Sequence, residues 1–421
     1  MSGANNGPVP QGMTETPTGR ITAAIGTAAD RSGPTTLTGL LRSRAGLLRE
    51  MAPVLLALVA IWIIFAALNP VFLSPRNISF LLVQTAVLGI IAIGVGFVLL
   101  IGEIDLSCAT TAGISAAVLA VLLQNAGFDP WVAVLVALCA AVVIGLFLGV
   151  FVAIVGVPSF IATLAALLGF NGVMLWVLGG AGTVNMGNAA IRALATTYLP
   201  PALTWALAAV VAVAAGAALM AGRAARTRAG LSVTPMWWTL SQFVLIVVVI
   251  VVVAALLNAY LGLPLPGLIL LVLAAIAVYI TRSTRLGRAL YAVGSNAEGA
   301  RRFGIPVVGV RIAAFAMGGL LFGIAGVLGA ARYSAASYAA FAGGTLLLEA
   351  VAAAVLGGIS LFGGRGRIAG AVLGALVIGS LGNGLDLMNA TTADKLMIEG
   401  AILLVAVAID AIYRRRGARR G

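Results

Sequence analysis

Apolar segments of similar length constrain the fold of this chain more than any other feature of its sequence. Each holds roughly the 20 residues that an α-helix needs to cross a bilayer, and short polar or Pro/Gly links separate most of them. Backbone groups inside lipid have to be hydrogen-bonded within the protein, which favours helices. We predict an all-α polytopic membrane protein with about twelve (10–12) transmembrane helices of this length. The predicted spans are residues 52–68, 78–101, 106–124, 131–155, 159–179, 201–221, 239–257, 266–281, 312–331, 345–362, 368–384 and 396–412.

The composition agrees with a protein that lies in lipid. Hydrophobic residues make up 62% of the 421 residues and charged residues only 9%, whereas soluble chains carry about 25% charged residues. This excludes a soluble globular enzyme, a coiled coil and a disordered protein. There is no histidine, and Lys395 is the only lysine, so a Gly-Lys-Ser/Thr phosphate loop is excluded. We expect no catalytic residue, no metal site and no cofactor on this chain; if ATP drives it, another chain binds ATP and magnesium.

The net charge of +13 points to a membrane and not to nucleic acid. The arginines lie between apolar segments and not on one face of a domain, as nucleic-acid binding would require. Cytoplasmic loops of membrane proteins carry an excess of Lys and Arg. With twelve spans and both termini in the cytoplasm, nearly all basic residues fall inside. The exceptions are Arg76, Arg192, Arg332 and Lys395.

The chain is predicted to have three parts. Residues 1–50 form a cytoplasmic tail, disordered because it is rich in Gly, Thr, Pro and Ser, with a short basic amphipathic helix over residues 37–50 that lies on the membrane surface. Residues 51–413 form the transmembrane domain, and residues 414–421 form a basic cytoplasmic tail. Glycines at helix-packing spacing within the spans predict a tight bundle. These include Gly145, Gly149, Gly318, Gly319 and Gly323.

The loop 282–311 is longer than a connection between two spans needs to be. Ser295 or Asn296 can cap a helix over residues 298–303, and Gly304 can end it. The loop is therefore predicted to hold a helix of about two turns at the membrane surface. One interpretation is a docking element for a partner that moves, and the alternative is a positively charged surface helix.

Several stretches carry a resemblance to a known family. Glu298-Gly299-Ala300, three further residues and Gly304 match the EAA-loop pattern, with Gly299 in place of alanine. The chain resembles the sugar-permease branch of ABC importer permeases over about residues 52–412. Other stretches that match this branch are Gly102–Ser107, Thr284–Arg288, Gly294–Asn296, Gly357–Gly366 and Lys395–Asp410.

The resemblance implies the ABC importer permease fold and a transport subunit that is not itself an enzyme. It implies a location in the bacterial inner (plasma) membrane, among lipid, and no nucleic-acid partner. The expected partners are an ABC ATPase subunit, an extracytoplasmic sugar-binding protein and a second copy of the chain. The residues expected to couple the permease to the ATPase are Gly294, Ser295, Asn296, Glu298, Gly299, Ala300, Arg301 and Gly304.

The expected substrate is a monosaccharide. The spans 201–221 and 239–257 enclose the basic stretch Arg223–Arg228 and are absent from the shorter ribose-type relatives. Permeases for xylose and for several monosaccharides share this insertion, which implies D-xylose. Arabinose, ribose, glucose and galactose stay open.

Polar residues within or at the ends of spans are candidates for the translocation path. Each is expected to form an interhelical hydrogen bond, and together they indicate where a sugar could pass. They are Gln84, Asn171, Glu349 and Asn383.

The remaining motif residues are predicted to be structural. Asp105 or Ser107 can cap the third span, beside Glu103, although ionisable groups at membrane depth also suggest function. The glycine run lacks the lysine of a phosphate-binding loop and is expected to form tight turns between helices. Its motif positions are Gly357, Gly358, Gly363 and Gly364.

Two other classes of protein are considered. A secondary sugar transporter driven by protons or sodium would need acidic groups within the spans, and Glu349 and Glu399 are the candidates. A membrane enzyme such as a lipid-linked glycosyltransferase is disfavoured by the missing histidines and the scarce carboxylates.

Overall fold

The computed structural model describes residues 37–231, 233–342, 344–401 and 404. The chain divides into two units, Met1–Arg49 and Glu50–Gly421. In the first unit, the described residues 37–49 are helical and belong to α2 (Leu37–Leu68). The predictions for residues 1–36, 405–412 and 414–421 lie outside the described residues. The two-tail organisation and the location of both termini stay predictions.

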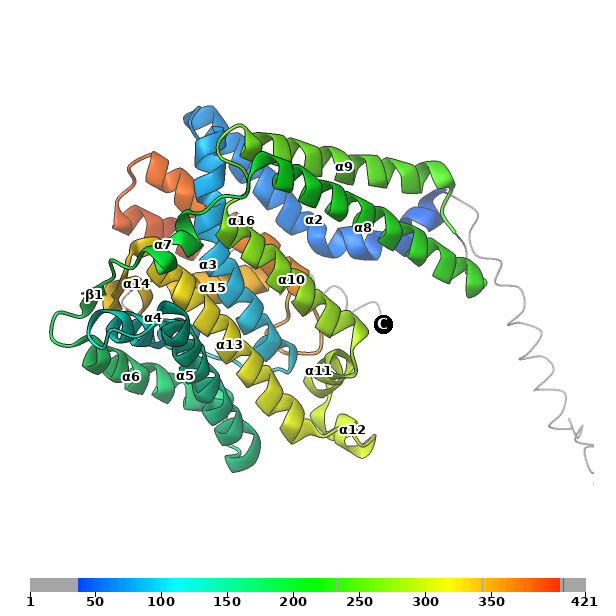
Figure 1. The fold of residues 1–421 in the computed structure, drawn as a ribbon. Helices are drawn as coiled ribbons and strands as arrows, with labels where there is room; N and C mark the ends of the chain where they lie inside the picture. Colours follow the sequence, from blue (N-terminus) through cyan, green and yellow to red (C-terminus); the bar gives the residue numbers. More distant parts are fainter. Residues whose placement is uncertain (1–36, 232, 343, 402–403, 405–421) are drawn as a thin grey trace, which may run out of the picture. The chain divides into compact units, whose positions relative to one another are not determined.

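The described part of the second unit is built almost entirely of helices (Figure 1). Nine of its described helical segments are long and apolar enough to span a membrane, if Tyr338–Leu356, which includes α14 and α15, is counted as one segment; Pro53–Leu68 and Cys108–Gln124 are shorter apolar helices. The prediction of a helical membrane protein is confirmed, whereas the count of twelve stays a prediction. The elements after α2 are α3 (Pro75–Leu100), α4 (Cys108–Gln124), α5 (Pro130–Val150), η1 (Phe151–Val155), α6 (Ser159–Leu178), β1 (Thr183–Asn185), α7 (Ala189–Thr196), α8 (Pro201–Arg228), α9 (Met236–Asn258), α10 (Leu265–Ser283), α11 (Arg285–Ser295), α12 (Ala297–Arg302), α13 (Val307–Tyr333), β2 (Ala335–Ser337), α14 (Tyr338–Phe341), α15 (Leu346–Leu356) and α16 (Ile368–Leu387).

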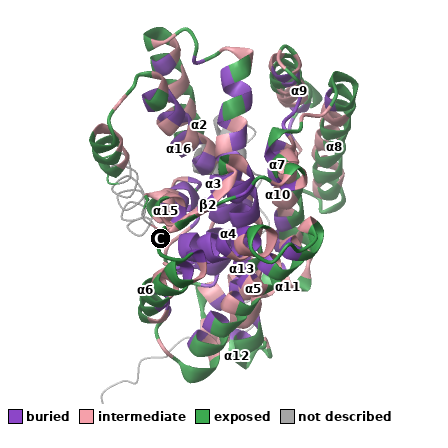
Figure 2. Cartoon of the chain, turned by 60° about the vertical axis from the view of Figure 1, so that its left-hand side comes forward, coloured by how far each residue is buried: buried purple, intermediate pink, exposed green. Residues whose placement is uncertain are grey.

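The core is made by α3, α4 and α13, which Figure 2 shows as mostly buried, while α6, α8 and α9 are mostly exposed. In the most apolar 18-residue stretch of each helix, 89% of the residues of α3 are buried, but only 6% of those of α8. Outer helices of a lipid-embedded bundle expose apolar side chains because the hydrocarbon around them is apolar as well. The predicted extra pair of spans is present as α8 and α9.

Close contact of backbones holds α5 against α13. A Cβ atom added to Gly319 would lie 2.5 Å from the carbonyl oxygen of Ala141, and one added to Gly145 would lie 2.4 Å from that of Phe315. Side chains at these positions would push the helices apart. The predicted packing role of these glycines is confirmed, since only small residues allow such an approach.

The structure differs from the prediction in two places. The helix in the span predicted over residues 345–362 is shorter than expected: α15 ends at Leu356, and a turn follows from Gly357. The short helix α14 precedes α15. The all-α prediction also missed β1 and β2, which pair antiparallel with Thr183 opposite Ser337. Such short strands have no periodic signal in the sequence, and their pairing depends on where α6 and α13 end.

The α5–α13 contact generates the first testable prediction. Gly319→Ala should lower the free energy of unfolding by about 1–3 kcal/mol, because the new methyl group overpacks a closed backbone contact. Thermal unfolding of the purified protein measures the effect. Gly169→Ala on α6 is the matched control, since no atom of the described residues lies within 4 Å of a Cβ added there. Equal unfolding temperatures for the two variants would contradict the role of the contact.

Candidate functional site

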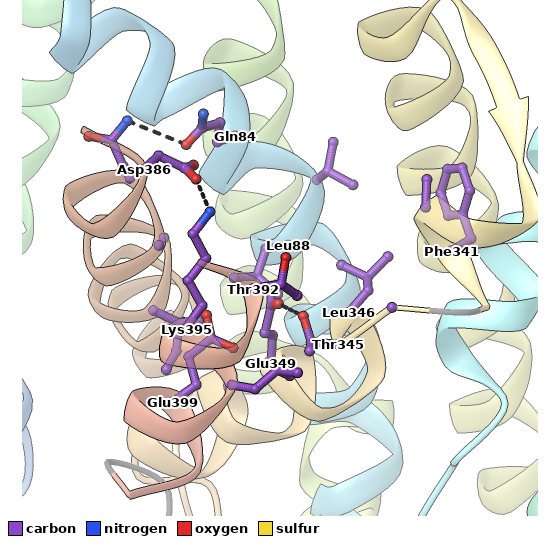
Figure 3. A pocket seen from close by; sticks show the side chains of 18 of the residues that line it. Gln84, Leu88, Phe341, Thr345, Leu346, Glu349, Asp386, Thr392, Lys395 and Glu399 are labelled. Carbon is purple, nitrogen blue, oxygen red and sulfur yellow. Dashed lines mark hydrogen bonds and ion pairs between the residues drawn. The ribbon is translucent and has the colours of Figure 1, made fainter. Parts of the chain in front are cut away.

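A polar pocket lies where the helix between β2 and residue 356 is interrupted (Figure 3). Its volume is about 290 Å³. Side chains from α3, the end of α13, the α14–α15 region, α16 and the helical residues 392–401 surround it. Discontinuous helices with exposed backbone ends are a common way to build a solute site inside a membrane protein. The polar and charged residues that line it are Gln84, Arg332, Thr345, Glu349, Asn383, Asp386, Thr392, Lys395 and Glu399.

Hydrogen bonds and one ion pair organise these side chains. The Thr345 hydroxyl donates to a carboxylate oxygen of Glu349, one turn into α15, and Lys395 pairs with Asp386 at the end of α16 (Figure 3). The amides of Asn383 and Asn77 donate to each other, with N···O distances of 3.1 and 2.7 Å. This pair connects α16 to α3.

The structure brings three of the four predicted path residues together. Gln84, Glu349 and Asn383 line the pocket, and the Asn383 amide donates to the Gln84 carbonyl oxygen at 3.5 Å. Asn171 is not among the lining residues; on α6 its side-chain oxygen accepts a hydrogen bond from Thr110, at 3.3 Å. The predicted interhelical hydrogen bonds are present for Gln84, Asn383 and Asn171, whereas the hydrogen bond to Glu349 comes from Thr345, at the start of its own helix.

Sequence reasoning did not assign the other charged residues to this site. Arg332, Asp386 and Lys395 come from helix ends, where charged residues are ordinary, so nothing local marks them. Their common location depends on the fold. The one signal in the sequence was Lys395, because it is the only lysine in the chain.

The loop 282–311 holds two helices, α11 and α12. Asn296 caps α12 as predicted, because its side-chain oxygen accepts a hydrogen bond from the Gly299 N–H at 2.8 Å. The alternative cap, Ser295, is wrong: it is the last residue of α11, and its hydroxyl donates to the Tyr291 carbonyl. Gly304 follows the helix with a φ of +78°, a conformation that favours glycine.

The side chains of α12 present a charged and aromatic surface. Glu298 and Arg302 form an exposed ion pair at 3.3 Å along the helix. Phe303, directly after α12, is 90% exposed.

The end of α11 contacts the residues after α3 and the loop after α15 through four glycines. We call these four residues the glycine joint: Gly102, Gly294, Gly363 and Gly364. The Gly364 N–H donates to the carbonyl oxygen of Leu100, the last residue of α3, at 2.9 Å. A Cβ atom on Gly294 would lie 1.9 Å from that same oxygen. Three motif stretches that are far apart in the sequence therefore meet behind α12.

Tyr291 strengthens the connection between α11 and the loop after α15. Its hydroxyl donates to the Gly366 carbonyl at 2.9 Å. The pKa of this hydroxyl is raised above its ordinary value, because the effect of burial is larger than the opposite effect of Arg282 and Arg367. The group therefore stays protonated and able to donate at neutral pH.

Comparisons with known proteins agree with this architecture. Residues 77–407 match the family described as the branched-chain amino acid transport system / permease component. The chain is 37% identical to the xylose transport system permease protein XylH of Escherichia coli over 361 residues, which cover 86% of this chain and 91% of that protein. The chain belongs to the ABC sugar permeases of the ribose and xylose type.

Other relatives give the same family. The XylH protein of Haemophilus influenzae is 36% identical over 369 residues, covering 86% of this chain and 97% of that protein. The ribose import permease protein RbsC of Bacillus subtilis is 32% identical over 365 residues, covering 87% and 94%. No solved structure matches. The permease is a multi-pass protein of the bacterial inner membrane.

The loop between α3 and α4 in this permease is fixed by two acidic residues. The buried Asp105 accepts hydrogen bonds from the backbone N–H and the hydroxyl of Ser107, at 2.7 and 2.6 Å. The pKa of Asp105 is raised above its ordinary value, because burial raises it more than the hydrogen bonds from Ser107 lower it. Glu103 forms an ion pair with Arg311 near the start of α13, at 3.2 Å. Ser107 occupies the N-cap position of α4 but makes no side-chain cap, so the prediction that it could be the capping side chain is wrong.

The glycine run of the permease turns tightly, as predicted. A Cβ atom on Gly357 would lie 2.2 Å from the backbone of Gly370, so α15 and α16 touch here. Gly358, Gly363 and Gly364 have φ values of +84°, +79° and +67°. Side chains at these positions would be strained.

The basic residues of the permease separate between its two ends. Arg76 begins α3 and Arg332 ends α13, so both lie far from α12, and Lys395 pairs with Asp386 at the same distant end. The arginines of the loop that holds α11 and α12, together with Arg365 and Arg367, lie at the α12 end. By the positive-inside rule, this distribution predicts that the α12 end faces the cytoplasm.

The glycine joint generates the second testable prediction. Gly294→Ala should lower the free energy of unfolding by about 1–3 kcal/mol through overpacking and should speed hydrogen exchange across α11 and α12. Gly309→Ala on α13 is the matched control, because its added Cβ would have no atom of the described chain within 4 Å. Unchanged exchange in both variants would show that α11 is not held through this joint.

Proposed function

We propose that this permease subunit carries D-xylose across the bacterial inner membrane as part of an ATP-driven importer. The observation that carries the choice of sugar is the similarity to relatives: those named for xylose are 36–37% identical, and those named for ribose are 32% identical. The other sugars considered are ribose, arabinose, glucose and galactose.

The proposal requires partner chains. The chain has one lysine, Lys395, outside any phosphate loop, so a separate cytoplasmic ATPase subunit would bind ATP and magnesium and hydrolyse ATP. A sugar-binding protein would deliver the sugar from outside. A second copy of the permease would complete the membrane-spanning part.

In this proposal α12 is the docking element for the ATPase. It is short, capped by Asn296 and followed by the exposed Phe303, and the glycine joint holds the preceding α11 to the end of α3. A movement of the ATPase would thereby reach the spans and alternate their access between the two sides. If α12 were only a positively charged helix at the membrane surface, no partner protein would cover the exposed side chain of Phe303.

The pocket is the proposed place of sugar passage. Gln84, Glu349 and Asn383 line it, and Asn171 has a separate place on α6. The second candidate, an ion-coupled sugar transporter, is favoured by one observation: both carboxylates that it would need, Glu349 and Glu399, line this pocket.

Transport assays in proteoliposomes distinguish the two candidates. The permease, its ATPase and the sugar-binding protein together should take up D-xylose only when ATP is supplied on the ATPase side. The permease alone should show no uptake under a proton or sodium gradient. Gradient-driven uptake by the permease alone would contradict the proposal and support the ion-coupled alternative.

The docking proposal gives a further testable prediction. Phe303→Ala should weaken ATPase binding by at least about 2 kcal/mol, as expected for an exposed aromatic anchor in a protein interface. Binding of the purified ATPase to the permease in nanodiscs measures this loss. Phe128→Ala, in the exposed segment between α4 and α5, is the matched control. Equal ATPase affinity for both variants would refute docking through α12.

A further inference from the structure

The pocket holds more charge than the passage of a neutral solute requires. Charged groups within membrane spans are costly and occur mainly where they have a function. Glu349 lies within α15, whereas Arg332, Asp386 and Lys395 come from helix ends. Here Arg332, Glu349, Asp386, Lys395 and Glu399 surround one cavity of about 290 Å³. Amides alone would have been enough for a polar lining.

The charged groups are arranged as hydrogen-bonding partners. Glu349 accepts from the Thr345 hydroxyl, and Asp386 accepts from Lys395. An ionised carboxylate has about four lone-pair sites and an ammonium three donor hydrogens, so each group can bind further partners. The side chains of Lys395 and Asp386 are 29% and 50% exposed, and a solute can therefore reach them.

Other residues that line the pocket are apolar. Val87, Leu88 and Ile378 line it together with the buried Phe341. A monosaccharide has hydroxyl groups around its edge and C–H groups on its faces, which match these two kinds of lining residue. The volume lies near the lower limit of about 300 Å³ for small-molecule sites, which fits one sugar ring.

We propose that this pocket is a monosaccharide-binding subsite of the permease, in which Glu349 and Asp386 accept hydrogen bonds from sugar hydroxyls and Lys395 donates one. The subsite rests on the proposed function, since it names residues that would hold the transported sugar. A zwitterionic amino acid is the competing ligand, because Arg332, Glu349 and Glu399 could pair with its carboxylate and ammonium groups. The similarity to permeases named for sugars favours the monosaccharide.

Protection of a thiol within the pocket tests binding directly. Thr392→Cys introduces the thiol, and Cys139→Ala removes the exposed native one. In the complete transporter, D-xylose at ten times its Kd should slow alkylation of the new thiol by about tenfold. Asn125→Cys, exposed after α4, is the matched control and should react at the same rate with and without sugar.

Variants of the charged groups test their assignment. Glu349→Gln and Lys395→Met should each raise the D-xylose concentration for half-protection by about tenfold or more, equivalent to about 1.4 kcal/mol. Asp129→Asn is the control, because Asp129 is an exposed cap of α5 and asparagine caps equally well. Thermal unfolding of each purified variant reports that it is folded.

The outcomes separate the subsite from the proposed function. A complex that imports D-xylose without any protection of the pocket thiol would overturn the subsite and leave the proposed function intact. Protection by L-leucine in place of D-xylose would overturn it in favour of an amino-acid site. A complex that imports no monosaccharide would contradict the proposed function, whereas protection by the sugar would still support the subsite.

Discussion

Close contact between backbones is the interaction on which this bundle depends. Lipid removes the hydrophobic driving force between helices, so association relies on van der Waals packing and on hydrogen bonds. Gly319 lies against the backbone of α5, and Gly294 lies against the last carbonyl of α3. Both contacts leave no room for a side chain. They explain how a protein with so little polar surface can hold its helices in one arrangement.

The same helices connect the glycine joint to the pocket. α3 runs from Gln84, at the pocket, to Leu100, at the joint, which is a distance of about 24 Å along a helix at 1.5 Å per residue. α15 carries Glu349 and leads into the loop with Gly363 and Gly364. A displacement of α11 therefore acts on two elements that line the polar cavity. This geometry supports mechanical coupling between an ATPase at α12 and a sugar path near the opposite end.

Local chemistry could be predicted from the sequence, whereas long-range placement could not. The cap at Asn296 and the stop at Gly304 act within one turn, so the short helix was correctly predicted. The β1–β2 contact joins residues 154 positions apart, and α15 ends at Leu356 inside the segment predicted as one apolar span over residues 345–362. The meeting of Asp386 and Lys395 with Glu349 follows from the packing of α15 and α16, which no local pattern reports.

Coupling between the two ends is tested most directly by the response of the pocket to nucleotide. The alkylation rate of a pocket thiol would be measured in the assembled transporter with and without ATP. ATP should change this rate when the glycine joint is intact, and Gly294→Ala should abolish the change while ATP hydrolysis continues. The contradicting result would be an alkylation rate that is the same with and without ATP in a transporter that hydrolyses ATP and imports sugar. It would show that α12 and the glycine joint do not couple the ATPase to the pocket.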